Sequence, residues 1–218
     1  MGAVTIEARE PDVVRRLEAI RILPLATLED PGEAEGVATA LVAGGVPCLE
    51  VTFRTPAAEA ALRRACEVDG LLVGAGTILT LEQAEVAAAA GAAFALAPGT
   101  NEDVVRRCRE LGLPCFPGVA TPSEVERARA LGLRALKVFP AEQLGGAPFL
   151  RALAGPYPDV RFIPTGGIGP GTLADYLALP SVLAVGGSWL VAPDLLRAGD
   201  YAEIERRARD AAAMASSA

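Results

Sequence analysis

The chain contains no histidine, and only one of its 20 basic residues is a lysine. Histidine is the commonest general base and metal ligand, so its absence excludes a Ser-His-Asp or Cys-His mechanism within one chain. The cysteines form no C-x-x-C pair, and Cys48 and Cys115 fall in apolar stretches typical of buried thiols. We therefore expect neither a metal site nor a cofactor, which leaves a carboxylate as the natural general base.

Targeting and membrane signals are also missing. No apolar stretch reaches the roughly 18 residues that span a membrane. The segment 1–12 carries acidic residues and lacks the basic start of a signal peptide. The net charge of -7 is opposite to that of a typical nucleic-acid binder. These features predict a cytoplasmic protein whose partners include no membrane and no nucleic acid.

Short apolar stretches alternate with amphipathic ones along all 218 residues, with no linker between them. Eight strands are predicted to begin near Ile22, Pro47, Leu71, Ala93, Pro114, Arg134, Val160 and Val182. Their spacing of roughly 20 to 26 residues suits a strand, a helix and two loops, so we predict one domain, 1–218, folded as a single (β/α)8 TIM barrel. An open doubly wound sheet is the competing fold.

An extra N-terminal helix is expected before the first strand, because Val13, Val14, Leu17 and Ile20 follow a helical spacing. It could plug the bottom of the barrel. Helix starts are marked by Thr80 and Thr121, each followed three residues later by Gln or Glu.

The second predicted strand contains alternating polar residues, Glu50, Thr52 and Arg54. Side chains two apart share one face of a strand, and the apolar alternates would pack under the helices. Glu50 and Arg54 should then point into the barrel, where a buried carboxylate is costly without a role or a partner. A purely structural Glu–Arg pair is the alternative.

The only lysine, Lys137, lies among apolar residues near the carboxyl end of the sixth predicted strand. In such a setting the ammonium form loses hydration, which favours the neutral amine, a nucleophile toward a carbonyl group. Active sites of these barrels form at this end of the strands. The alternatives are a structural pair with a carboxylate and a point charge for phosphate.

Glycine clusters follow the last two predicted strands, at 166–169 and 186–187. Backbone N–H groups in such loops often bind phosphate, although a tight turn alone would also use glycine. The earlier run 74–77 resembles the start of a dinucleotide fingerprint, but its third glycine is replaced by Leu79, so a Rossmann fold is rejected.

Seven segments in register resemble the family of 2-dehydro-3-deoxy-phosphogluconate (KDPG) aldolases and 4-hydroxy-2-oxoglutarate (KHG) aldolases, from about Ile22 to about Asp200. They are 42–46, 49–55, 73–77, 97–99, 137–142, 164–168 and 186–190.

The resemblance implies a role for each matching residue. Lys137 would form a Schiff base and Glu50 would be the acid/base. The substrate-binding residues would be Arg54 and Thr77 at the pyruvyl carboxylate, Pro98 and Phe139 lining that pocket, and Thr165 at the aldol carbon. The phosphate would bind at Gly166, Gly167, Gly187 and Ser188. The family is typically a homotrimer and needs no metal.

The function expected is therefore a class I aldolase that releases pyruvate from a 2-oxo-3-deoxy sugar acid phosphate, from KHG, or from both. An aldolase for the galactose-derived phosphate is possible, but the run 50–55 fits the gluconate type better. Two alternatives remain: a phosphosugar isomerase or epimerase with Glu50 as base, and a non-catalytic barrel that binds a phosphate ligand.

Overall fold

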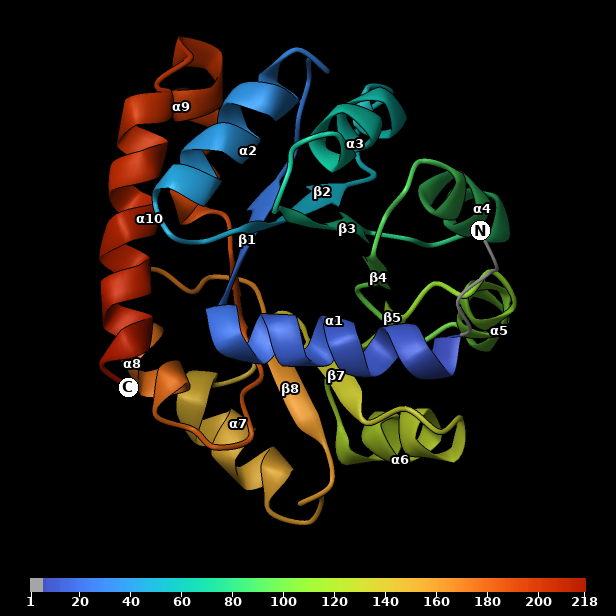
Figure 1. Ribbon diagram of the computed structural model, residues 1–218. Helices are drawn as coiled ribbons and strands as arrows, with labels where there is room; N and C mark the ends of the chain where they lie inside the picture. The colour runs from blue at the N-terminus through green and yellow to red at the C-terminus, as the bar shows by residue number, and fades with distance from the viewer. Residues whose placement is uncertain (1–5) are drawn as a thin grey trace.

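A curled sheet of parallel strands surrounded by helices forms the protein, as seen in a computed structural model that describes residues 6–218 (Figure 1). The strands are β1 (Ile22–Ala26), β2 (Cys48–Thr52), β3 (Leu72–Gly76), β4 (Phe94–Leu96), β5 (Cys115–Phe116), β6 (Gly118–Val119), β7 (Ala135–Val138), β8 (Arg161–Pro164) and β9 (Val185–Gly187). The helices are α1 (Ile6–Ile20), α2 (Glu33–Ala43), α3 (Ala58–Cys66), α4 (Leu81–Ala89), α5 (Glu102–Glu110), α6 (Pro122–Ala130), α7 (Gly146–Ala154), α8 (Leu173–Leu177), the 3-10 turn η1 (Trp189–Val191), α9 (Pro193–Ala198) and α10 (Tyr201–Ser216).

The strands are ordered β5-β4-β3-β2-β1-β9 in one sheet and β6-β7-β8 in a second. β5 and β6 are consecutive segments separated only by Pro117. Isolated parallel bridges join Phe162 to Val182 and Thr165 to Gly186, so β8 lies beside β9. This order contradicts the open doubly wound alternative, in which the strand order reverses at β1 and places β1 beside a middle strand instead of the last one, β9.

The strand starts agree with the alternation of apolar and amphipathic stretches. Seven predicted starts lie at, or one residue before, the first residue of the matching strand. The eighth does not, because β9 begins at Val185 and Val182 forms only an isolated bridge. The last strand is short, and a Gly-Gly pair leaves little side-chain pattern from which to predict its start.

Helix ends follow the expected local chemistry. The Thr80 side chain accepts the backbone N–H of Gln83, whose side chain returns the contact in a capping box. Thr121 likewise accepts from Glu124, with proline at the next position. Gly91 and Gly112 take positive φ angles of 95° and 66° just after their helices, which lets the next strand begin at once.

Helix α1 crosses the face where the strands begin (Figure 1). Its Leu17 is completely buried, and its Arg16 donates to the carbonyl of Gly70, which precedes β3. Its Glu18 forms an ion pair of 2.9 Å with Arg161, the first residue of β8. The opposite face, where the strands end, is therefore left for a site.

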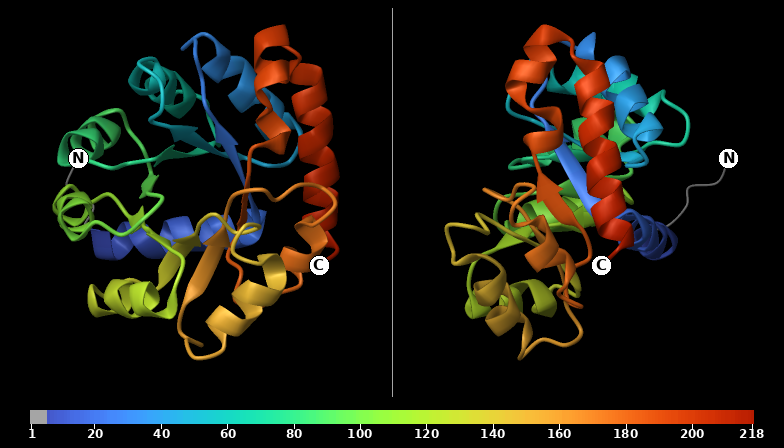
Figure 2. Two further views of the ribbon diagram at one scale, coloured as in Figure 1. Left: turned by 180° about the vertical axis from the view of Figure 1, so that it is seen from behind. Right: turned by 90° about the vertical axis from the view of Figure 1, so that its left-hand side faces the viewer.

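The last long helix, α10, runs beside α2 on the outside of the sheet (Figure 2). The two helices approach so closely that a Cβ at Gly44 would come within 2.5 Å of the Ala208 Cβ. Over residues 6–218, no helix combines the length and the apolar composition needed to cross a membrane.

Candidate active site

Lys137 lies on β7 and is only 4 % exposed. Its neighbours Leu136 and Val138 are fully buried under the helix layer. The alternation of the strand therefore turns Lys137 to the inner side, where its Nζ lies 3.2 Å from Glu50 Oε1 and 5.8 Å from the centre of the Phe139 ring.

Glu50 reaches the lysine from β2, and its side chain is completely buried. Glycine at position 76 on β3 makes room for it, since a Cβ there would lie 2.1 Å from Glu50 Oε1. One carboxylate oxygen binds Lys137, whereas Oε2 has no hydrogen-bond partner within the described part of the chain. An unpaired buried oxygen is costly, and it leaves this carboxylate free to exchange a proton with a ligand.

Arg54 and Thr77 meet at the ends of β2 and β3. Arg54 Nε donates to Thr77 Oγ1 at 3.3 Å. Thr77 has a φ of 61°, a conformation that costs a non-glycine residue about 1–3 kcal/mol and that occurs mostly at functional sites. No carboxylate of residues 6–218 forms an ion pair with Arg54, so its guanidinium retains donors for an anion.

A cavity of about 390 Å³ opens at the carboxyl ends of the strands. It brings together seven of the predicted site residues: Arg54, Phe139, Thr165, Gly166, Gly167, Gly187 and Ser188. Lys137 and Glu50 are not part of its lining, but Phe139 contacts both the cavity and the lysine. Two further predicted residues, Thr77 and Pro98, also lie outside the lining; Pro98 packs against Gly118, which is in register with Lys137.

The two glycine loops are adjacent, because Thr165 and Gly186 form a parallel bridge. Gly167 has a φ of 80°, which favours glycine. The backbone N–H groups of Gly167 and Ser188 donate to no acceptor among the described residues. Both residues line the cavity, and free backbone N–H groups in a glycine loop suit a phosphate dianion.

Residues not predicted as site residues also line the cavity. The hydroxyl oxygens of Thr27 and Thr52 lie 2.8 Å apart at its wall, and Trp189 forms another part of that wall. Thr27 could have been found from sequence, because it is the first polar residue after a buried strand. Trp189 gave no such signal, because its contact with the cavity depends on the η1 turn.

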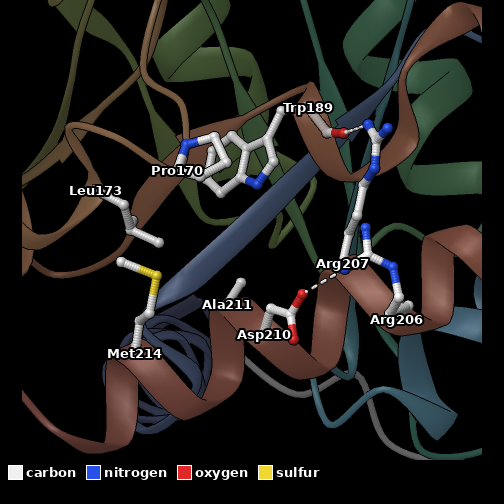
Figure 3. A pocket seen from close by; sticks show the side chains of 8 residues that line it. All are labelled: Pro170, Leu173, Trp189, Arg206, Arg207, Asp210, Ala211 and Met214. Carbon is white, nitrogen blue, oxygen red and sulfur yellow. Dashed lines mark hydrogen bonds and ion pairs between the residues drawn. The ribbon is translucent and has the colours of Figure 1, made fainter.

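A separate cavity of about 470 Å³ lies next to α10 and shares Trp189 with the first (Figure 3). Its charged side chains are already engaged: Arg206 binds Asp210 at 2.8 Å, and Arg207 donates to the Trp189 carbonyl at 2.6 Å. None of the predicted site residues lines this second cavity, whereas seven line the cavity at the strand ends. Within residues 6–218, no three His, Cys, Asp or Glu side chains gather as metal ligands.

The geometry agrees with comparisons to known proteins. The family model described as KDPG and KHG aldolase matches residues 13–207. A 2-dehydro-3-deoxy-phosphogluconate aldolase of Treponema pallidum is 49% identical over 195 residues, covering 88% of this chain and 92% of the relative.

Two solved structures are similar to the whole fold. The KDPG aldolase of Zymomonas mobilis with 3-phosphoglycerate has a TM-score of 0.88 and 40% identity, covering 94% of this chain and 97% of the other. The KDPG aldolase of Legionella pneumophila, with pyruvate captured as a covalent carbinolamine, has a TM-score of 0.86 and 37% identity, covering 90% and 96%. This chain belongs to the family of KDPG and KHG aldolases.

Proposed function

We propose that this protein is a class I aldolase that cleaves KDPG to pyruvate and glyceraldehyde 3-phosphate, KHG to pyruvate and glyoxylate, or both. The observation that carries the proposal is the buried pair of Lys137 and Glu50, 3.2 Å apart, beside a cavity with an arginine at one side and glycine loops at the other. Family membership and the covalent carbinolamine of the Legionella relative support the same chemistry.

The reaction follows from these groups. The neutral amine of Lys137 attacks the C2 ketone, and loss of water gives an iminium that accepts electrons. Glu50 takes the proton of the C4 hydroxyl while the C3–C4 bond breaks, which releases an aldehyde and leaves an enamine on Lys137. The same carboxylic acid returns a proton to C3, and water then hydrolyses the iminium to free pyruvate.

The remaining residues would bind the substrate. Arg54, held by Thr77, would pair with the carboxylate at C1, a charge-assisted contact that fixes the ketone near the lysine. Phe139 and Pro98 would enclose the pyruvyl part, and Thr165 would contact the aldol carbon. At the other side of the cavity, the phosphate of KDPG would bind to the loop residues Gly166, Gly167, Gly187 and Ser188.

The proposal extends to the architecture. We infer that the two sheets act as one closed (β/α)8 barrel in a single domain, with α1 covering its amino-terminal end. The short break at Pro117 between β5 and β6 and the bridges between β8 and β9 support closure. We also propose that the protein is cytoplasmic and forms a homotrimer. The apolar side chains of Leu79 and Leu81 are exposed, and a neighbouring protomer would bury them.

Borohydride trapping tests the proposed chemistry. Incubation with pyruvate and sodium borohydride should add one reduced adduct, which mass spectrometry of peptides should map to Lys137. Pyruvate omitted from the mixture is the control. An isomerase or a simple phosphate-binding barrel would give no adduct, and an adduct confined to the terminal amine would refute the Schiff-base mechanism.

A further inference from the structure

Glu142, in the turn that follows β7, contacts the start of the loop 166–172 and the helix α8 that follows this loop. At the start of this loop, the backbone N–H of Glu142 donates to the Gly166 carbonyl at 3.1 Å. Just beyond its end, Tyr176 on α8 donates its hydroxyl to Glu142 Oε1 at 2.6 Å. One residue therefore joins the turn after the lysine strand to the loop and to the helix that follows it.

The loop also rests directly on this turn. A Cβ at Gly167 would come within 2.7 Å of the Glu142 Cβ, and one at Gly166 would lie 3.3 Å from the Phe139 ring. Both glycines have positive φ angles, 105° for Gly166 and 80° for Gly167. The backbone thus follows the surface of the turn so closely that a displacement of Glu142 would displace the two glycines, which line the cavity.

The hydrogen bond from Tyr176 to Glu142 is expected to be stable. Tyr176 is completely buried, and this burial, with the hydrogen bond to Glu142, raises the pKa of its phenol. The phenol therefore remains a donor throughout the working pH range. A short hydrogen bond to a charged acceptor is among the stronger kinds in proteins.

We propose that Glu142 and Tyr176 are positioning residues that hold the loop 166–172 in the shape that binds the phosphate group of the substrate. Neither side chain lines the cavity, so both act through the loop. This inference rests on the proposed function for its choice of substrates. It differs from a purely electrostatic role, in which the negative charge of Glu142 would repel the phosphate.

KHG is a built-in comparison, because it carries no phosphate. Tyr176→Phe removes one hydrogen bond and should raise KM for KDPG about five- to tenfold, with kcat and the KM for KHG within about twofold of the wild type. Glu142→Gln keeps an acceptor for the phenol and should have a smaller effect. The matched control is Tyr157→Phe, since Tyr157 also donates to a glutamate, Glu126, at 3.3 Å, away from the loop.

Calorimetric binding of 3-phosphoglycerate, with glycerate as the unphosphorylated partner, tests the loop without turnover. Tyr176→Phe should weaken 3-phosphoglycerate binding by a similar factor, and Tyr157→Phe should not. Equal increases in KM for both substrates would overturn the inference, as would unchanged binding in Tyr176→Phe. Tighter binding by Glu142→Gln would indicate the electrostatic role instead. If the wild type gave no pyruvate adduct, the proposed function would fail while this binding test still decided the role of Glu142 and Tyr176.

Discussion

Glu50→Gln separates the two roles that its geometry allows. The carboxylate could merely hold the Lys137 ammonium 3.2 Å away, or it could carry protons during the reaction. Glutamine keeps the size of the side chain and an acceptor for the lysine, but it cannot take a proton. If Glu50 is the general acid/base, kcat should fall about 10²–10⁴-fold.

The structure also predicts that Glu50→Gln keeps pyruvate binding and most of its stability. Arg54 and Thr77 remain to bind the pyruvate carboxylate, so the borohydride adduct should still form, more slowly. Stability should change by less than the 3–5 kcal/mol typical of breaking a buried ion pair, because the glutamine oxygen remains an acceptor for Lys137 Nζ. Thermal unfolding would measure this, and Glu50→Asp, which withdraws the carboxylate by about 1.5 Å, provides a charged comparison.

The assay combines KDPG cleavage with exchange of the pyruvate methyl protons in deuterated water. Both rates should fall in parallel, because one carboxylic acid would protonate and deprotonate the same enamine. Near-wild-type cleavage and exchange in Glu50→Gln would refute the reasoning, and the base would then be a water or another group.

Three other outcomes are expected. Gly167→Val should raise KM for KDPG more than for KHG, because a side chain at a φ of 80° meets Glu142 and distorts the phosphate loop; equal losses would mean that the loop is only structural. EDTA should leave cleavage intact, and recovery of a lost activity by a divalent ion would contradict a class I mechanism. Hydrogen bonds from Arg206 and Arg207 lower the pKa of Glu203 to about 2. The Glu203 carboxylate therefore stabilises the fold above its pKa in the unfolded chain, about 4.3, and this stabilisation is lost as the pH falls toward 2. Glu203→Gln should therefore lower Tm at pH 7 but not near pH 2, and a deficit of equal size at both would show that charge is not the cause.

The pattern within single strands was enough to predict that Lys137 and Glu50 meet. Alternation on its strand predicted that Glu50 points inward, and the apolar surroundings of Lys137 near the end of another strand predicted that the two would meet; the structure places Lys137 Nζ 3.2 Å from Glu50 Oε1. Helix caps at Thr80 and Thr121 were predictable for the same reason, because the signal lies within four residues. Local periodicity therefore gives both the elements and the inward residues.

Features that depend on distant packing were not predictable. The hydrogen bond from Tyr176 to Glu142 joins residues 34 positions apart. The left-handed backbone of Thr77 depends on how two strand ends meet, since a threonine carries no signal for a positive φ. The contact of Pro98 with Gly118, the residue in register with Lys137, also joins separate segments of the chain.

The burial of the only lysine has a practical consequence for labelling. Every other basic side chain is an arginine, so the surface offers no lysine amine to acylating dyes or crosslinkers. Lys137 is only 4 % exposed and is bound to Glu50. Amine-directed reagents should therefore leave the surface formed by residues 6–218 almost unlabelled.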